Sequence, residues 1–228
     1  MLRDLLLKIV RSKQPILFQD LQRTEPVSRL FGFDRGTPID RYYVEHFLTK
    51  QRHLIKGRVL EVGDSGYSRL FGGDQVERFE VLHAVEDGGA TIVGDLTDCS
   101  TLPENAIDCF ICTQTFNFIF DVQKAVQGAH HLLKPGGVLL ATVAGISQIS
   151  RYDMERWGDY WRFTDASLKM LFGPVFQGGV EVVAHGNALA ACSFLQGVAV
   201  EDLPDRSLLD RKDPDYQLLL TIVARKEG

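Results

Sequence analysis

The sequence predicts an α/β domain with one open, mostly parallel sheet of seven strands and helices on both faces. Short apolar runs alternate with helical segments from residue 57 onward. The runs are apolar throughout, as in parallel strands that are buried on both faces. The chain has 228 residues, of which 45% are hydrophobic and 24% charged, and this suits one globular domain with a sizeable core.

Seven segments have the length and composition of strands. Each is a run of mostly apolar residues bounded by glycine, proline or charged residues. These segments are residues 58–63, 79–85, 90–96, 106–115, 137–145, 179–186 and 216–225. Ligands of such a sheet bind at the carboxyl ends of its strands, where the strand order reverses, so the loops after the strands deserve the closest reading.

Helices are expected between several of these strands. Asp121 is a suitable N-cap for a helix over 122–133, which the following KPGG sequence ends. Thr164 can cap a helix that runs through Phe172 and stops at the next Gly-Pro pair. Both helices connect consecutive strands, which predicts right-handed crossovers.

Three other segments are also expected to be helical. Upstream of the first strand, Thr37 suits an N-cap, Pro38 the first helical position and Asp40 the third. Residues 187–203 form a second helical segment. The N-terminal sequence MLRDLLLKIVRSKQ carries a helical stripe of apolar residues, which predicts a surface helix: Leu2, Leu5, Leu6 and Ile9.

Charge and cysteine content exclude several classes of function. The net charge of −5 gives no general attraction to nucleic acid, and no apolar run is long enough to span a bilayer. Cys109 and Cys112 form a lone C-x-x-C inside a predicted strand, where residues three apart point to opposite faces. We therefore expect buried thiols, no metal site and a cytoplasmic protein.

The loop after the first strand, in LEVGDSGYSRLFGG, is the first candidate binding site. Backbone N–H groups converge at such a strand end, and glycine lets a ligand approach them. The dinucleotide pattern G-x-G-x-x-G fails, because Ser65 and Ser68 replace its later glycines. The pattern acidic-x-G-x-G-x-G matches at Glu61 and Gly63 but has Ser65 and Tyr67 afterwards. Taken alone, the loop also allows a tight turn without a ligand.

Polar residues at the ends of two later strands support a ligand site. Asp95 ends the third predicted strand, where its carboxylate can accept a hydrogen bond from an adenine amino group. Thr113, Gln114 and Thr115 end the fourth strand, and LKPGGVLLAT leads into the fifth. These features occur in order along the chain and favour a nucleoside-containing cofactor.

In this order, residues 57–145 resemble the class I S-adenosylmethionine-dependent methyltransferases. The segments LKPGG and DCFICTQT resemble the methyltransferase type 11 branch. A longer set, namely DRGTPIDRYYVEHFL, LEVGDSGYSRLFGG and GISQISRYDMERWGDYWRFT, is similar to a bacterial subgroup associated with glycan or secondary-metabolite biosynthesis.

The resemblance implies a Rossmann-like class I methyltransferase fold with S-adenosylmethionine as its cofactor. It implies an N-terminal helical cap over residues 1–56 and a methyltransferase domain over 57–228, with a substrate-facing segment at 146–165. The residues expected to bind the cofactor are Arg41, Glu61, Gly63, Asp64, Ser65, Gly66, His83, Asp95, Leu96, Thr113, Gln114 and Thr115.

Two of these positions leave alternatives open. His83 stands near the place where most such enzymes have an acidic residue for the ribose, and Glu86 and Asp87 follow slightly later. Arg41 can pair with the cofactor carboxylate or with Glu45, one helical turn further on.

The segment SRYDMERWGDYWRFTD, residues 150–165, is the candidate for binding the methyl acceptor. It concentrates aromatic residues, carboxylates and arginines, which together suit a sugar or another polyhydroxylated molecule. Because a hydroxyl acceptor usually needs a general base, Asp159 is the first candidate, followed by Asp153 and His185. We expect an O-methyltransferase that acts on a saccharide or glycosylated small molecule, as a monomer or homodimer.

Two other classes of protein remain as alternatives. A nucleotide-dependent oxidoreductase or epimerase would need the missing glycines and usually a Tyr-x-x-x-Lys pair, which the tyrosines of this chain do not form. A non-catalytic partner protein that binds S-adenosylmethionine is compatible with the irregular loop, although Glu61, Gly63 and Asp95 argue against it.

Overall fold

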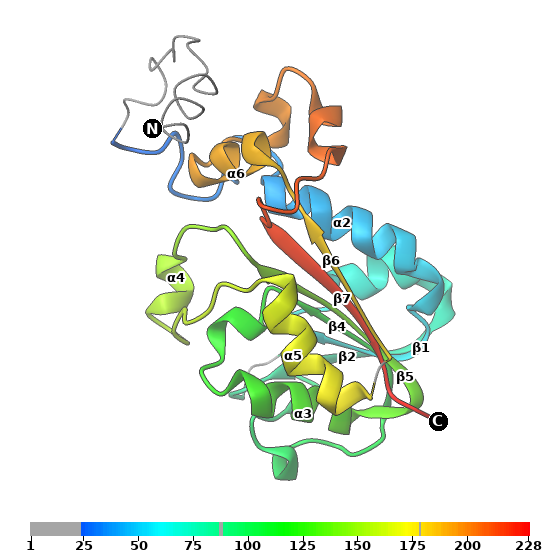
Figure 1. Ribbon diagram of the computed structural model, residues 1–228. Helices are drawn as coiled ribbons and strands as arrows, with labels where there is room; N and C mark the ends of the chain where they lie inside the picture. Colours follow the sequence, from blue (N-terminus) through cyan, green and yellow to red (C-terminus); the bar gives the residue numbers. More distant parts are fainter. Residues whose placement is uncertain (1–23, 87–88, 178) are drawn as a thin grey trace, which may run out of the picture.

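The computed structural model describes residues 24–86, 89–177 and 179–228, and its centre is one seven-stranded sheet (Figure 1). The strand order is β3-β2-β1-β4-β5-β7-β6. Only β7 runs antiparallel to its neighbours, β5 and β6. The strands are β1 (Gly57–Val62), β2 (Val76–His83), β3 (Ile92–Val93), β4 (Ile107–Thr113), β5 (Leu133–Ala144), β6 (Val180–His185) and β7 (Leu219–Arg225). The predicted α/β fold class is confirmed.

Helices cover both faces of this sheet (Figure 1). They are α2 (Ile39–Gln51), α3 (Val122–Leu132), α4 (Arg151–Met154), α5 (Asp165–Phe176) and α6 (Ala188–Leu195). Helices α3 and α5 pack on one face, and α2 and α6 lie on the other. The N-terminal stripe predicted for residues 2–9 lies outside the described residues. In the part of the chain that the structure describes, no helix has the length and apolar character needed to cross a membrane.

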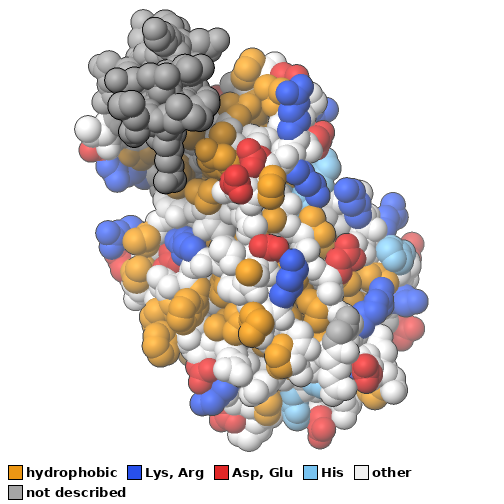
Figure 2. Space-filling model, in the orientation of Figure 1, with side chains coloured by type: hydrophobic (Ala, Val, Ile, Leu, Met, Phe, Trp, Pro, Cys, Tyr) orange, Lys and Arg blue, Asp and Glu red, His pale blue; other side chains and the backbone are white. Residues whose placement is uncertain are grey.

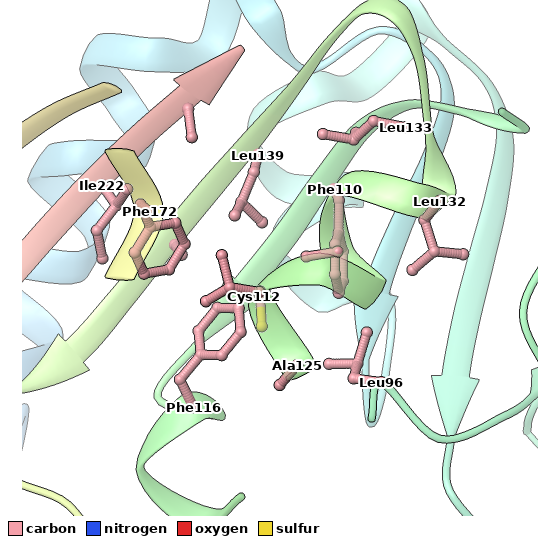
Figure 3. Close-up of a cluster of buried hydrophobic side chains, with 14 of the residues drawn as sticks. Leu96, Phe110, Cys112, Phe116, Ala125, Leu132, Leu133, Leu139, Phe172 and Ile222 are labelled. Atoms are coloured by element: carbon pink, nitrogen blue, oxygen red, sulfur yellow. The ribbon is translucent and has the colours of Figure 1, made fainter. Parts of the chain in front are cut away.

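Each face of the sheet has its own hydrophobic core. Figure 3 shows Phe110, Cys112 and Phe116 packed with Phe172 of α5 on the α3 side. Cys109 belongs to the core on the α2 side, so the two cysteines face opposite sides of the sheet as predicted. Both thiols are free and fully buried, and burial raises the pKa of Cys112 to about 12. These cysteines are part of the core.

The cap predicted at Asp121 is confirmed, whereas the one predicted at Thr37 is wrong. The Asp121 side chain accepts a hydrogen bond from the backbone N–H of Lys124 at the start of α3. Helix α2 begins at Ile39 and has Pro38 in the N-cap position. Thr37 instead donates its hydroxyl to Glu201, at 2.7 Å, because the chain before α2 lies against the 3₁₀ turn Val200–Asp202.

The predicted end of α5 is also wrong. The helix continues through Gly173 and Pro174 to Phe176. A proline in the last turn loses one backbone hydrogen bond, but Phe176 is buried in the core and stacks on Phe172 with ring centroids 6.2 Å apart. This packing keeps the extra turn helical.

The remaining boundary differences are largest at the third strand, the fifth strand and the segment 187–203. The third strand is reduced to the two residues of β3, which lies at the edge of the sheet. After β3 the chain turns away from the sheet, and the Asp95 N–H donates a hydrogen bond to the Thr101 hydroxyl in this turn. Strand β5 starts at Leu133, since the KPGG segment bulges out of the ladder with β4. The segment 187–203 is α-helical only over α6, turns at Gly197, where φ is +68°, and ends in the 3₁₀ turn Val200–Asp202.

Candidate active site

The carboxyl ends of β1 to β4 surround a cavity of about 620 Å³, the strand-end cavity. Its walls combine backbone, small residues and apolar side chains with a few polar groups. The lining residues predicted from the sequence are Gly63, His83, Asp95, Leu96, Gln114 and Thr115. Leu82 and Phe118 add apolar walls. This is the edge of the sheet at which open α/β folds bind ligands.

Gly63 leaves space for a ligand at the end of β1. Its φ is +86°, which favours glycine, and no heavy atom lies within 4 Å of the position that a Cβ would take. The Nε2 atom of His83 lies 2.8 Å from the Gly63 carbonyl oxygen and fixes the turn from the side of β2. Thus His83, at the position where the resemblance implies a ribose contact, holds the loop backbone.

Four predicted residues shape the loop and do not line the strand-end cavity. Glu61 is buried and accepts hydrogen bonds from the N–H groups of Tyr67 (3.1 Å) and Ser68 (2.9 Å). Burial raises the pKa of Glu61, although these hydrogen bonds oppose the change. The Asp64 carboxylate accepts from the N–H of Gly66, and the Ser65 hydroxyl accepts from Arg69.

The ends of β3 and β4 supply the predicted polar groups. One carboxylate oxygen of Asp95 accepts hydrogen bonds from the N–H and hydroxyl of Thr97, and the other has no partner among the described residues. Gln114 has a φ of +51°, an uncommon conformation for a residue other than glycine. Its N–H donates to the Thr142 carbonyl, which anchors the strained turn to β5. Thr113 remains within β4.

A second cavity of about 150 Å³, the α2 cavity, adjoins the first. Gln114, Phe118 and Asp153 line both. The α2 cavity is also lined by Asp40 and Arg41 from the first turn of α2. The two cavities therefore form one cleft with a junction at these three shared residues.

Arg41 explains one irregularity of the glycine loop. Its guanidinium lies 5.4 Å from the ring centroid of Tyr67 and 5.5 Å from that of Phe33, and it donates a hydrogen bond to the Tyr67 hydroxyl. Tyr67 stands where the pattern has its last glycine. Here the side chain points toward α2 and connects the loop to the N-terminal part of the chain.

The three candidate bases have different surroundings. The Asp159 carboxylate is 1% exposed and accepts two hydrogen bonds from Arg162, at 2.5 and 2.9 Å, and one from the Ser150 N–H. Burial alone would raise the pKa of Asp159, but these donors lower it. Asp153 accepts one hydrogen bond from the Ser150 hydroxyl at 2.5 Å, and its other oxygen has no partner in the described part of the chain.

His185 lies in a different cavity, of about 480 Å³, between α2 and β6 (the β6 cavity). Burial lowers the pKa of His185 to about 4, and the positive charges of Lys212 and Lys50 contribute. None of the residues that line the β6 cavity lines the strand-end cavity or the α2 cavity. The structure therefore does not bring His185 together with Asp153 and Asp159.

Sequence reasoning missed two groups of lining residues. The sequence predicts Asp40 only as a residue of the first turn of a helix. Nothing in the sequence around Asp40 indicates that it lines the α2 cavity. Phe118, Ile119 and Phe120 line the strand-end cavity from the loop between β4 and α3. An apolar FIF run at a strand end that is expected to meet solvent is a signal that could have revealed them.

The chemistry of the cleft fits a nucleoside cofactor with a charged tail. The open space at Gly63 accommodates close approach to the backbone, the free oxygen of Asp95 can accept an amino hydrogen, and Leu82 and Leu96 offer apolar walls to a flat base. Arg41 is a cation for an anionic group.

Comparison with known proteins agrees with this chemistry. Residues 57–141 match the family model described as "Methyltransferase domain". This part of the chain is therefore similar to a methyltransferase domain, which agrees with the cofactor expected from the sequence, S-adenosylmethionine. The matched residues contain β1 to β4 and most of β5, so the match includes the strand ends that line the strand-end cavity.

Solved structures share the fold at low sequence identity. An S-adenosylmethionine-dependent methyltransferase from Archaeoglobus fulgidus has 13% identity and a TM-score of 0.54, covering 87% of this chain and 100% of that one. One from Mesorhizobium loti has 16% identity and a TM-score of 0.50, covering 86% and 100%. A possible exported protein from Bordetella parapertussis has 16% identity and a TM-score of 0.51, covering 86% and 72%. No curated protein sequence matches the chain. The seven-stranded sheet is thus the class I methyltransferase fold.

Proposed function

We propose that this S-adenosylmethionine-dependent methyltransferase methylates a hydroxyl group of a saccharide or a glycosylated small molecule. In this proposal Asp153 is the general base, and the segment 146–165 binds the acceptor. The segment that ends at residue 56 serves as a cap that carries Arg41 to the cofactor. The observation that supports the proposal most is the position of Asp153 at the junction of the two cavities.

Asp153 is better suited than the other candidates to accept a proton. It lines both cavities, and one of its carboxylate oxygens has no partner among the described residues. The Asp159 carboxylate is paired with the Arg162 guanidinium, and this ion pair stabilises the conformation of the segment 146–165. His185 belongs to the β6 cavity. We therefore assign Asp159 a positioning role and place Asp153 next to the reacting hydroxyl.

An aromatic rim at the mouth of the strand-end cavity suits the apolar face of a sugar ring. Phe120 is 71% exposed, Tyr160 49% and Trp157 47%, and all three line the cavity. Phe120 and Tyr160 meet edge to face with centroids 5.4 Å apart. Figure 2 shows hydrophobic side chains gathered on the side of the molecule where α4 lies in Figure 1. Exposed aromatic groups beside carboxylates are typical of polyhydroxylated ligands.

Different residues of the cleft would have different roles in methyl transfer. When bound, the cofactor supplies a methyl group that its sulfonium already activates. Asp153 would take the proton of the acceptor hydroxyl while the new C–O bond forms and the bond between the methyl group and the cofactor sulfur breaks, which would leave S-adenosylhomocysteine. The aromatic rim orients the acceptor, and Phe118 at the junction limits the access of water.

Methyl transfer from radiolabelled S-adenosylmethionine to a panel of free sugars, nucleotide sugars and glycosylated small molecules tests this proposal. For an acceptor that is methylated, Asp153→Asn should lower kcat at least about a hundredfold. Its affinity for S-adenosylhomocysteine, measured by calorimetry, should stay unchanged. Glu155→Gln, an exposed neighbour outside both cavities, is the matched control and should keep full activity.

Two results would contradict the proposal. Full activity of Asp153→Asn would eliminate Asp153 as the base. Tight binding of S-adenosylhomocysteine without methylation of any acceptor in the panel would instead support a non-catalytic partner protein.

A further inference from the structure

The β6 cavity, which lies outside the cleft, has a floor made by two neighbouring strands. Glu181, Val183 and His185 are alternate residues of β6 and therefore share one face of the strand. The β7 partners of the first two residues, Val223 and Thr221, continue this floor. The cavity volume of about 480 Å³ lies within the range of about 300–1,000 Å³ that small-molecule sites occupy.

Helix α2 and the segment between α6 and β7 form the rest of the cavity. On α2, the residues Tyr43, Phe47 and Lys50 follow the spacing of one helix face. Leu209 and Lys212 line the cavity from the other segment. The Tyr43 hydroxyl donates a hydrogen bond to the Leu209 carbonyl at 2.9 Å, so these two parts of the wall are connected.

Apolar side chains give the cavity space for an apolar ligand body. Phe47 and Leu209 are buried, and Val183 of the floor is half-buried. The rings of Tyr43 and His185 lie with their centroids 5.6 Å apart and add flat surfaces. Pockets of this kind bind small molecules through apolar contacts, and a few polar groups select the ligand.

Two lysines supply positive charge to the cavity without a direct counter-ion. Within the described ranges, the side chains of Lys50 and Lys212 form no ion pair and no hydrogen bond. Both charges act on His185, because they lower the pKa of its ring together with burial. Cations that oppose the protonation of a histidine create a positive potential there, and this potential stabilises an anion.

The carboxylates that line the cavity leave these lysines without a close partner. Asp210 accepts a hydrogen bond from the Tyr42 hydroxyl at 2.8 Å. Glu181 is exposed, and no ion pair joins it to a residue that the structure describes. Water and salt screen an exposed carboxylate of this kind. The charged groups of the cavity therefore favour an anionic ligand.

We propose that the β6 cavity binds an organic anion whose carboxylate or phosphate group contacts Lys50 and Lys212. The apolar body of this ligand packs against Phe47, Val183 and Leu209. The ligand is neither the cofactor nor the methyl acceptor, because no residue of the β6 cavity lines the strand-end cavity or the α2 cavity. The inference does not depend on the proposed function.

Calorimetry in saturating S-adenosylhomocysteine, which occupies the cofactor site, tests this proposal with four probes. The probes 2-naphthoate and 2-naphthyl phosphate share one apolar body and differ in the anionic group. The third probe, 2-naphthamide, has the same body without the charge, and inorganic phosphate has the charge without the body. At least one naphthyl anion should bind at a single site, about tenfold or more tightly than the amide and inorganic phosphate. The tighter anion shows whether the site prefers a carboxylate or a phosphate.

Removal of each lysine tests where the anionic group binds. Lys50→Gln and Lys212→Gln should each weaken the affinity for the tighter naphthyl anion about tenfold and leave the affinity for 2-naphthamide unchanged. Lys56→Gln is the matched control, because Lys56 is an exposed lysine just before β1 that does not line the cavity. This variant loses the same charge and should bind the anion like the wild type.

Three results would overturn the proposal. The first is that neither naphthyl anion binds, and the second is that 2-naphthamide binds as tightly as the anions. The third is that Lys50→Gln and Lys212→Gln bind the anion with the affinity of Lys56→Gln. A chain that binds the anion through these two lysines but does not bind S-adenosylhomocysteine would support this inference and contradict the cofactor assignment.

Discussion

The two walls of the cleft are built in different ways. One wall consists of the ends of β1 to β4, whose backbone positions the sheet fixes. The other wall, residues 147–163, contains only the single turn of α4 and depends on side-chain contacts, above all between Asp159 and Arg162. The first wall can keep its shape while the sequence changes. The second can change its shape through a few substitutions, which is compatible with the acceptor-binding role proposed above.

Gly63→Val should have the largest effect on cofactor affinity, because it changes the first wall at the end of β1. The added side chain would occupy the open space at the end of β1. We expect the affinity for S-adenosylhomocysteine to fall more than about a hundredfold in calorimetry. Gly136→Val is the control, because Gly136 has a similar φ of +78° and equally open space but lies away from the cavity. Equal affinities in the two variants would show that Gly63 does not face the cofactor.

Asp159→Asn tests how the second wall is held. Removing the charge leaves the Arg162 guanidinium without its partner, although its partial exposure reduces the cost. We expect the free energy of unfolding, measured in urea, to fall by about 2 kcal/mol. Proteolysis within residues 147–163 should increase while S-adenosylhomocysteine affinity stays constant. A parallel loss of cofactor affinity would mean that the two walls are not independent.

The first wall was the part that the sequence could reveal. Continuous apolar runs mark buried strands, and Gly63, Asp95 and Gln114 follow them at fixed places because strand ends meet at one sheet edge. The structure of the second wall depends on which of its carboxylates forms an ion pair with an arginine. Asp153 and Asp159 are indistinguishable by composition, and only their three-dimensional surroundings separate them.

Asp40 shows the same limit in another element. An acidic residue in the first turn of a helix has an ordinary explanation, namely a favourable interaction with the helix dipole. Its contact with the α2 cavity arises because α2 packs across the sheet beside the loop after β1. That arrangement depends on contacts between distant residues, and local sequence patterns do not record it.

The pH dependence of stability distinguishes His185 from the residues of the cleft. Its folded-state pKa is about 4, below the ordinary value of 6.5, so the unfolded chain binds more protons between these values. The stability that His185 contributes is present above about pH 6.5 and is lost as the pH falls toward 4.

The unfolding free energy of the wild type should therefore decrease between pH 6.5 and pH 4. In His185→Gln we expect this decrease to be smaller by about 2 kcal/mol. Urea titrations at several pH values measure this decrease. The affinity for S-adenosylhomocysteine should not change, since the β6 cavity shares no lining residue with the cleft. A His185→Gln variant with the pH profile of the wild type would contradict the assignment of the lowered pKa to this residue.

Trp161→Phe should have the smallest effect, and it tests the connection between the two walls. The Trp161 indole N–H donates to the carbonyl groups of Ile119 (3.1 Å) and Phe120 (3.2 Å), which belong to the loop after β4. Phenylalanine keeps most of the ring packing and loses this donor. We expect the unfolding free energy to fall by about 1 kcal/mol and cofactor affinity to weaken a few-fold, because Ile119 and Phe120 line the strand-end cavity.

Trp157→Phe is the control for this variant. Trp157 lines the same cavity, but its indole nitrogen has no hydrogen-bond partner among the residues that the structure describes. If both variants weaken cofactor binding equally, the loss of affinity results from the smaller ring and not from the loss of the Trp161 hydrogen bonds. If only Trp161→Phe does so, the second wall positions the loop after β4 through the Trp161 hydrogen bonds. The two walls would then differ in how they are built, and the Trp161 hydrogen bonds would make cofactor binding depend on the second wall.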